Sequence, residues 1–177
     1  TANILTETIE TFKAIILSPS EFFQNMPLDG GLQKPVVFLL IASVVSSLGI
    51  LVISQQPLQA VQELGVRLVT SFVSAAYLFL ICRGVGGQGT FEGTFRAFVY
   101  ASAPAIFSWV PLVNVLAVIY TLFLLKTGLE KAHDLSPQRS MTAVGIWLVT
   151  LIVLIVIVTM ATTAAVFKPK ESGIPGI

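Results

Sequence analysis

Long apolar stretches, free or nearly free of charge, alternate with short polar segments along most of this chain. Residues 36–54 contain no Asp, Glu, Lys or Arg. As a helix they would be about 28 Å long, close to the thickness of a bilayer's hydrocarbon core. Similar segments follow, and the pattern predicts five membrane spans in an all-α helical bundle, over residues 36–54, 64–82, 91–109, 111–126 and 141–167.

The third and fourth predicted spans are joined by a very short, almost apolar connection. Pro104 and Pro111 are both predicted to be helix-kink positions: Pro104 lies inside the third span, and Pro111 is also well placed to open the fourth. A tight hairpin of two spans is the favoured interpretation. The alternative is a single bent helix over residues 97–125, which at roughly 44 Å would be too long for an ordinary span.

The first residues have a different pattern. Apolar side chains recur at steps of three and four at Leu5, Ile9, Phe12 and Ile16, and charged residues fall elsewhere on the helical wheel. Residues 3–17 are therefore expected to form an amphipathic helix that lies in the membrane interface or packs on the bundle, because they are too charged to span.

The distribution of Lys and Arg predicts an orientation. With five spans, seven of the ten basic residues lie on the side of the N-terminus, and such an excess marks the cytoplasmic face. We expect the N-terminus in the cytoplasm and the C-terminus outside. The chain then divides into a cytoplasmic interfacial segment (residues 1–30), a five-span domain (31–168) and a short external tail (169–177).

Composition supports a membrane protein and excludes several other classes. Apolar residues make up 55% of the chain and charged residues only 11%, against about a quarter charged in soluble domains. The lipid bilayer is therefore the expected partner. A net charge of +1 argues against nucleic acid, which requires a basic face. The single cysteine, Cys82, leaves no internal disulfide to form.

A polar turn between the fourth and fifth spans is a candidate metal site. Glu130 and His133 lie three residues apart, with Asp134 adjacent, and this spacing is typical of helical ligands for a divalent metal. The competing interpretation is a solvated turn whose histidine contacts local carboxylates. No other cofactor is expected. No acid, base and nucleophile occur in a recognisable pattern, so we predict that the protein is not an enzyme.

The glycine-rich segment over residues 84–93 is a candidate anion site. It contains a formal G-x-G-x-x-G pattern, but a membrane helix precedes it in place of the strand that a dinucleotide site requires. A close-approach turn at the cytoplasmic rim is the favoured interpretation. The alternative is a phosphate or lipid headgroup bound by Arg83, Gly87, Gly89 and Arg96.

Small and polar residues inside the spans predict helix contacts. Ala97, Ala101 and Ala105 are spaced by four on the third span, which allows close helix approach within the bundle or between subunits. Asn114 on the fourth span is expected to contact another helix. These contacts make a homo-oligomer, or association with other membrane proteins, the expected assembly.

Glu63 and Arg67 are spaced by four near the outer end of the second span. Mutual pairing and snorkelling to the interface explain them adequately. A buried pair that lines a polar cavity is the alternative.

Several short motifs occur in a characteristic order: Leu17-Ser18-Pro19-Ser20-Glu21-Phe22-Phe23, Gly86-Gly87-Gln88-Gly89-Thr90-Phe91, Tyr100-Ala101-Ser102-Ala103-Pro104, Trp109-Val110-Pro111, Gly128-Leu129 and His133-Asp134-Leu135-Ser136. With them the chain resembles the Yip-domain family, in particular its prokaryotic branch. The resemblance implies a five-span helical protein with a cytoplasmic N-terminus, here in the plasma (inner) membrane of a prokaryote. Eukaryotic relatives are implicated in vesicle traffic and interact with prenylated Rab GTPases. The long hydrophilic N-terminal region of those relatives is missing from this sequence, so a Rab-binding role is not expected.

Three functional hypotheses follow from these observations. The leading one is a membrane scaffold or adaptor that works by helix–helix association. The second is an oligomeric ion channel or small transporter, for instance for a divalent metal that enters near Glu130 and His133. The third is binding of lipid headgroups at the glycine-rich rim.

Overall fold

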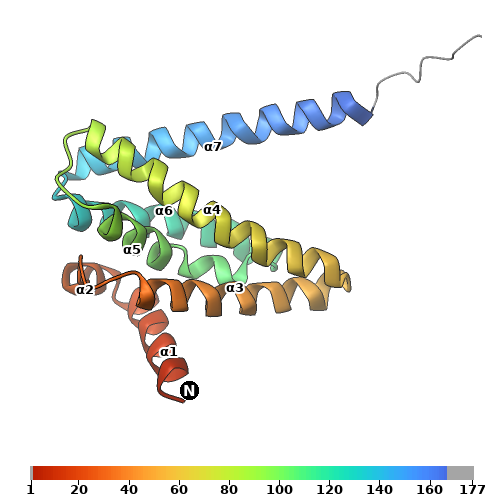
Figure 1. Cartoon of the computed structure of the whole chain (residues 1–177), viewed down its shortest axis with the longest axis horizontal. Helices are drawn as coiled ribbons and strands as arrows, with labels where there is room; N and C mark the ends of the chain where they lie inside the picture. Colours follow the sequence, from red (N-terminus) through yellow and green to blue (C-terminus); the bar gives the residue numbers. More distant parts are fainter. Residues whose placement is uncertain (1, 167–177) are drawn as a thin grey trace, which may run out of the picture.

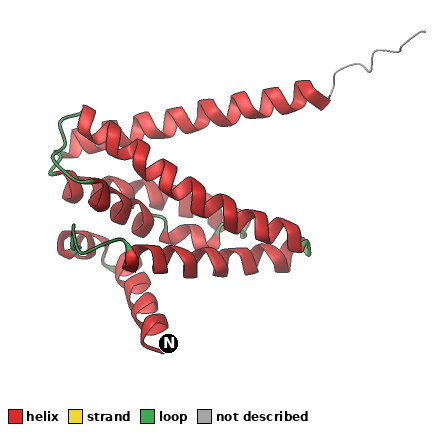
Figure 2. Ribbon diagram, viewed as in Figure 1, coloured by secondary structure: helices red, strands yellow, loops and turns green. Residues whose placement is uncertain are grey.

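The computed structural model describes residues 2–166, and within that range the chain is helical and contains no strand (Figures 1 and 2). The predicted tail over 169–177, together with Lys168, lies outside the described residues. The elements, in chain order, are α1 (Ala2–Leu17), α2 (Pro19–Asn25), α3 (Gln33–Ser54), α4 (Pro57–Gly84), α5 (Phe91–Ala101), the 3₁₀ helix η1 (Ala103–Phe107), α6 (Pro111–His133) and α7 (Pro137–Val166).

Four of these helices, α3, α4, α6 and α7, are long and apolar enough to cross a membrane. They contain the predicted spans over 36–54, 64–82, 111–126 and 141–167, apart from residue 167, and extend beyond the predicted spans. The molecule is therefore a helical protein with several apolar helices of membrane-spanning length, as the hydropathy indicates.

The third predicted span, 91–109, is not one kinked helix. The α-helix α5 ends at Ala101, and Pro104 falls in the first turn of η1. Proline lacks the amide hydrogen that would continue the ladder, so the chain ends the α-helix before it instead of bending through it. Pro111 likewise begins α6 and kinks nothing. Helices α5 and α6 pack against each other, so the chain turns back between them and the single bent helix over residues 97–125 is wrong.

The connection predicted over residues 126–139 is largely helical. Helix α6 continues past Lys126 to His133, and Asp134 caps it in the left-handed region, at φ 51°. An ion pair of 2.7 Å between Lys126 and Glu130, one helical turn apart, supports the extension. Hydropathy predicts where a helix leaves the apolar layer of a membrane. Helix α6 continues past that position before it ends.

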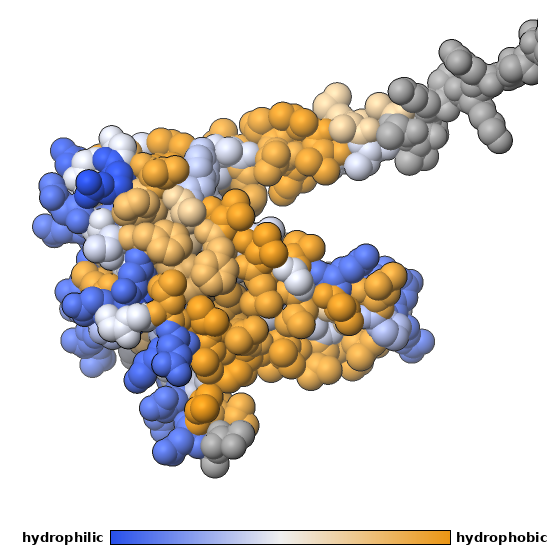
Figure 3. Space-filling model, in the orientation of Figure 1, coloured by the Kyte–Doolittle hydropathy of each residue, from blue (hydrophilic) through white to orange (hydrophobic). Residues whose placement is uncertain are grey.

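The polar connections gather at one end of the bundle. In Figure 1 the α2–α3 linker, the α4–α5 loop and the α6–α7 turn lie together, and the α3–α4 turn lies at the opposite end. Figure 3 shows hydrophilic residues concentrated at the first end and an apolar surface over most of the remainder. We call the first end, formed by residues 25–33, 84–90 and 134–136, the polar end.

Helix α5 is the innermost element, and α7 is the outermost. Eight of the eleven residues of α5 are buried. Along α7, by contrast, only 11% of the most apolar window is buried, compared with 22–28% in the other three long helices. Figure 1 shows α7 diverging from the bundle as it leaves the polar end.

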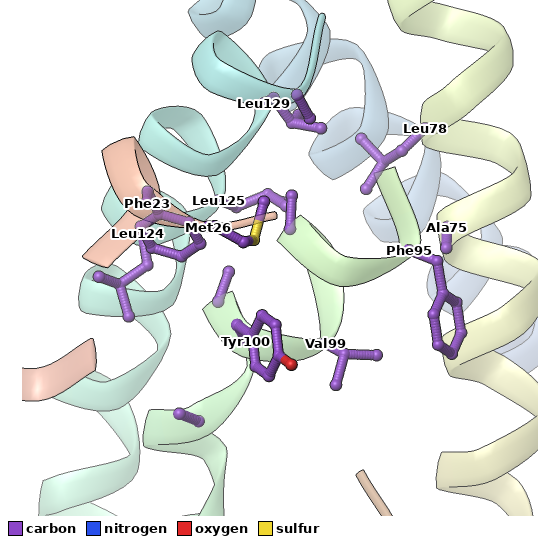
Figure 4. Packing of buried hydrophobic residues seen from close by; sticks show 14 of the residues in the cluster. Phe23, Met26, Ala75, Leu78, Phe95, Val99, Tyr100, Leu124, Leu125 and Leu129 are labelled. Carbon is purple, nitrogen blue, oxygen red and sulfur yellow. The ribbon is translucent and has the colours of Figure 1, made fainter. Parts of the chain in front are cut away.

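Small residues hold α5 close to α6. Ala97 and Ala101 are fully buried, and a methyl group added at Gly128 would lie 3.0 Å from the Ala97 side chain and 2.9 Å from the Phe23 ring. Figure 4 shows Phe23 beside Leu124 in this core. The predicted small-residue seam therefore packs within the chain, and Ala105, in η1, is half-buried at its end.

Helix α1 is present where the amphipathic pattern predicts it. Its inner side packs on the bundle: Ile15 is fully buried, and the Tyr120 hydroxyl donates to the carbonyl of Ile16 at 2.9 Å. Its place in a membrane interface stays a prediction.

Candidate functional site at the polar end

The glycine-rich loop between α4 and α5 is fastened to the C-terminus of α6. The amide of Gln88 donates to the carbonyl of His133 at 3.0 Å, and the amide of Gly89 donates to His133 Nδ1 at 3.2 Å. The amide of Gly87 donates back to the carbonyl of Cys82 at 2.8 Å. The loop thus joins the C-terminus of α4 to the C-terminus of α6. The two bonded residues, Gly89 and His133, are 44 positions apart in the sequence.

His133 is a neutral imidazole at the centre of this junction. It is 1% exposed, and Thr94 beside it is fully buried. Because Nδ1 accepts from Gly89, Nε2 carries the proton and donates to Thr94 Oγ1 at 2.7 Å. The Thr94 hydroxyl donates in turn to the carbonyl of Thr90 at 2.8 Å. Each donor has one acceptor, so the chain of hydrogen bonds is complete.

Only glycine fits where the loop crosses α6. A methyl group on Gly89 would lie 2.1 Å from the carbonyl oxygen of Ala132 and 2.7 Å from His133 Nδ1. A methyl group on Gly87 would lie 2.8 Å from the carbonyl of Cys82. Both glycines therefore serve the close approach of backbones, which is the favoured interpretation of this segment from the sequence.

Arg96 ties the α2–α3 linker to α5. Its guanidinium donates to Glu92 Oε1 at 3.0 Å and, by a short hydrogen bond, to the carbonyl of Gly31. The amide of Gly31 donates to the same Glu92 oxygen at 2.7 Å. The arginine side chain is 3% exposed, so this charge is enclosed and its hydrogen bonds lie within the fold.

A cleft of about 470 Å³ borders the hydrogen-bonded groups around His133 and around Arg96. It exposes one basic and several acidic side chains, and His133 lies in its wall. The lining residues are Leu28, Asp29, Gln88, Gly89, Thr90, Glu92, Lys131, Ala132, His133 and Asp134.

The structure does not assemble the predicted metal ligands. Glu130 pairs with Lys126 and accepts from the Ser140 hydroxyl at 2.8 Å, while both nitrogens of His133 are engaged elsewhere. Asp134 is exposed at the helix cap. Within residues 2–166, no three His, Cys, Asp or Glu side chains are grouped to hold a metal ion.

Three of the four predicted anion ligands are engaged within the chain. Arg83 is exposed in the last turn of α4, whereas Arg96 is enclosed by its own partners. The amides of Gly87 and Gly89 donate within the chain. What the sequence reasoning missed is the pairing of the glycine loop with His133. The sequence contains the two motifs 44 residues apart, and no local signal links them.

Asn114 does not provide the expected interhelical hydrogen bond within the described part of the chain. It lies half-buried in the first turn of α6, where its backbone amide donates to the carbonyl of Val110 at 2.8 Å. The hydroxyl pair Ser46–Ser108, at 3.1 Å, is the polar contact that joins helices near this level.

Comparison with known proteins gives one match. The family model of the Yip1 domain covers residues 13–159, which include the end of α1, all of α2 to α6 and most of α7. No curated protein and no solved structure matches the chain. Because the match covers most of the chain and includes both halves of the glycine-loop junction, this membrane protein belongs to the Yip1-domain family.

Proposed function

We propose that this protein is a non-enzymatic membrane scaffold or adaptor that associates with other transmembrane helices through α7. The observation that carries the proposal is the contrast in burial. The polar end of α7 packs on the bundle, with Ala143 fully buried, whereas every residue from Ile152 to Ala164 is exposed. A helix that its own chain leaves uncovered is the surface available to a partner in the bilayer.

The exposed part of α7 has residues suited to close helix contact. In lipid, apolar burial alone gives little drive for association, so interfaces depend on small side chains and on hydroxyl groups. Thr159, Ala161, Thr162 and Thr163 lie within one and a half turns of each other on this part. The small-residue seam of α5 packs inside the chain. We therefore propose that α7, instead of that seam, forms the contact between copies of a homo-oligomer.

The same proposal includes five crossings of the membrane. Helix α5 and η1 together have a length of about 27 Å, from eleven α-helical and five 3₁₀ residues. That is close to the hydrocarbon thickness, so the pair can serve as the third crossing. Lys34, Arg83, Lys131 and Arg139 lie at or beside the polar end, which supports a cytoplasmic polar end and N-terminus in a prokaryotic plasma membrane.

Disulfide crosslinking in native membranes tests the role of α7. The single native cysteine, Cys82, is buried and is replaced by alanine first. Thr159→Cys is then expected to give a dimer or a mixed adduct on oxidation, and Val69→Cys, on the exposed face of α4, serves as the matched control. If neither cysteine crosslinks and the protein purifies as a monomer without partners, the scaffold proposal is wrong.

No observation favours the channel hypothesis as strongly as the exposure of α7 favours the scaffold proposal. The Glu130–His133 turn is occupied by hydrogen bonds and an ion pair within the chain. Flux of a divalent ion into liposomes, lost on Glu130→Ala, would reverse this preference.

A further inference from the structure

A cleft of about 390 Å³ lies between the first half of α1 and the start of α3, with a residue of α5 in its wall. Figure 1 shows α1 running across the direction of α3, close to the polar end. A helix that lies in the plane of a membrane interface has this orientation. The volume is within the range of pockets that bind small molecules.

The lining of the cleft changes from polar to apolar along α3. Gln33 and Lys34, in the first turn of that helix, form the polar part, and Val37 and Phe38 follow about one turn further into the bundle. Because α3 begins beside the polar end (Figure 1), the polar part is at the level of the membrane interface and the apolar part is at the level of the hydrocarbon. The head and the acyl chains of a phospholipid occur in the same order.

Tyr100 of α5 contributes a hydroxyl to this cleft from a buried position. The residue is 7% exposed, and its ring packs edge-on against Phe22 and Phe38, with centroids 5.3 Å apart in each pair. Within residues 2–166 the hydroxyl has no hydrogen-bond partner, and its oxygen is not sealed from solvent. In Figure 4 it points away from Phe23 and Leu124. The cleft therefore has a fixed donor for an acceptor that the chain itself does not supply.

Two opposite charges line the same cleft without pairing to each other. Glu7 on α1 and Lys34 on α3 are both exposed, and the ion pairs among the described residues involve neither of them. A purely anionic ligand would be attracted by Lys34 and repelled by Glu7, whereas a ligand with one anionic and one cationic group is complementary to both. The charges therefore favour a zwitterionic head.

We propose that this cleft binds a phospholipid whose head contains a phosphate and a primary ammonium group, as in phosphatidylethanolamine. The phosphate accepts from Lys34 Nζ and from the Tyr100 hydroxyl, beside the N-terminus of α3, where the helix dipole also favours an anion. The ammonium group donates to the Glu7 carboxylate, which choline, without an N–H, cannot do. An acyl chain lies along Val37 and Phe38. This proposal does not depend on the scaffold role.

Native mass spectrometry of the full chain in a neutral maltoside tests the proposal, with phosphatidylethanolamine, phosphatidylcholine and phosphatidylglycerol of identical acyl chains as the probes. We expect phosphatidylethanolamine to bind the wild type most tightly. Tyr100→Phe keeps the packed ring and removes the hydroxyl, so it should weaken the binding of all three lipids about tenfold. Lys34→Gln should weaken all three about fivefold.

Glu7→Gln separates the two parts of the head. It should weaken phosphatidylethanolamine about threefold to fivefold and leave phosphatidylglycerol no weaker, so that the preference between them is lost. Glu10→Gln and Lys13→Gln change the same kinds of charge at exposed positions of α1 outside the cleft, and these matched controls should leave binding within about twofold. Because Glu7 is exposed, its variant keeps the test valid even if Tyr100→Phe fails to fold.

Three results would overturn the proposal. The first is a wild type that binds none of the three lipids, binds them equally or prefers phosphatidylglycerol. The second is binding that Tyr100→Phe and Lys34→Gln leave unchanged. The third is an equal loss of binding in Glu7→Gln and Glu10→Gln, which would mean that the charge of the α1 surface, and not the cleft, attracts the lipid.

Discussion

The polar end and the distal part of α7 are stabilised in opposite ways. At the polar end, His133 and Arg96 are enclosed, and both are hydrogen-bonded to specific partners on other elements. From Ile152 to Ala164, α7 makes its hydrogen bonds within its own helix and exposes its side chains on all sides. In a bilayer the apolar surface costs nothing to expose, so polar contacts and close packing decide which helices are held together.

The largest expected effect comes from filling the contact between the glycine loop and α6. Gly89→Ala places a methyl group 2.1 Å from a backbone carbonyl that cannot move without disturbing the end of α6. We expect a loss of at least ~3 kcal/mol in the free energy of unfolding, measured by titration with a denaturing detergent in mixed micelles.

Gly65→Ala is the matched control for that prediction. Gly65 lies in α4, and a methyl group there would meet nothing within 4 Å. Because alanine favours a helix over glycine, this variant should be unchanged or more stable by up to about 1 kcal/mol. Equal losses in the two variants would mean that the loop does not approach α6 as closely as described.

Removing the charge at Arg96 should have the next largest effect. Arg96→Ala leaves Glu92 and the carbonyl of Gly31 without their partner inside the fold, and we expect a loss of about 3 kcal/mol. Hydrogen exchange should show faster exchange at the amide of Gly31, which loses the ordered carboxylate that it bonds. Arg83→Ala, at an exposed position in the last turn of α4, should stay within about 0.5 kcal/mol of the wild type; comparable losses at both positions would contradict the role of Arg96.

The hydropathy predicted where four of the apolar helices lie, because each contains enough consecutive apolar residues to specify itself. Thr90, directly before α5, is of the residue type that caps helices, and its hydroxyl accepts from the amide of Gly93 at 3.1 Å. Such caps are local, so a sequence window of four residues contains them in full.

The junction at the polar end could not be predicted in the same way. The Glu130–His133 spacing indicates a metal site only if nothing else binds those side chains, and Thr94, Gly89 and Ser140 do so from other segments. The sequence predicts that Arg67 snorkels to the interface. Whether its side of α4 faces the bundle or the lipid depends on the tertiary packing, which a single sequence does not contain. Long-range partners, and the direction in which a helix faces, are the parts that a single sequence lacks.

A milder change tests the hydrogen-bond chain through the histidine. Thr94→Val keeps the shape of a fully buried side chain and removes the hydroxyl that accepts from His133 Nε2. We expect a loss of about 1–3 kcal/mol, since a buried N–H is left unpaired. Thr142→Val, on the exposed side of α7, should change stability by less than about 0.5 kcal/mol. The protein has one histidine, so its ¹⁵N spectrum should show an unprotonated Nδ1 directly, and a protonated Nδ1 would contradict the assignment.

The smallest effect is expected on the distal part of α7, and it gives the sharpest test of the contrast between the two regions. Ile157 is 58% exposed, whereas Leu124 is fully buried. In dilute detergent, Leu124→Ala should cost about 2–5 kcal/mol, because it opens a cavity, and Ile157→Ala should cost less than about 0.5 kcal/mol. In membranes at high protein density, the scaffold proposal predicts a larger cost for Ile157→Ala that rises with the concentration of the protein, since association adds to stability by mass action. A cost for Ile157→Ala that is already large in dilute detergent would show that α7 packs against its own bundle, and the surface assigned to partner helices would then not exist.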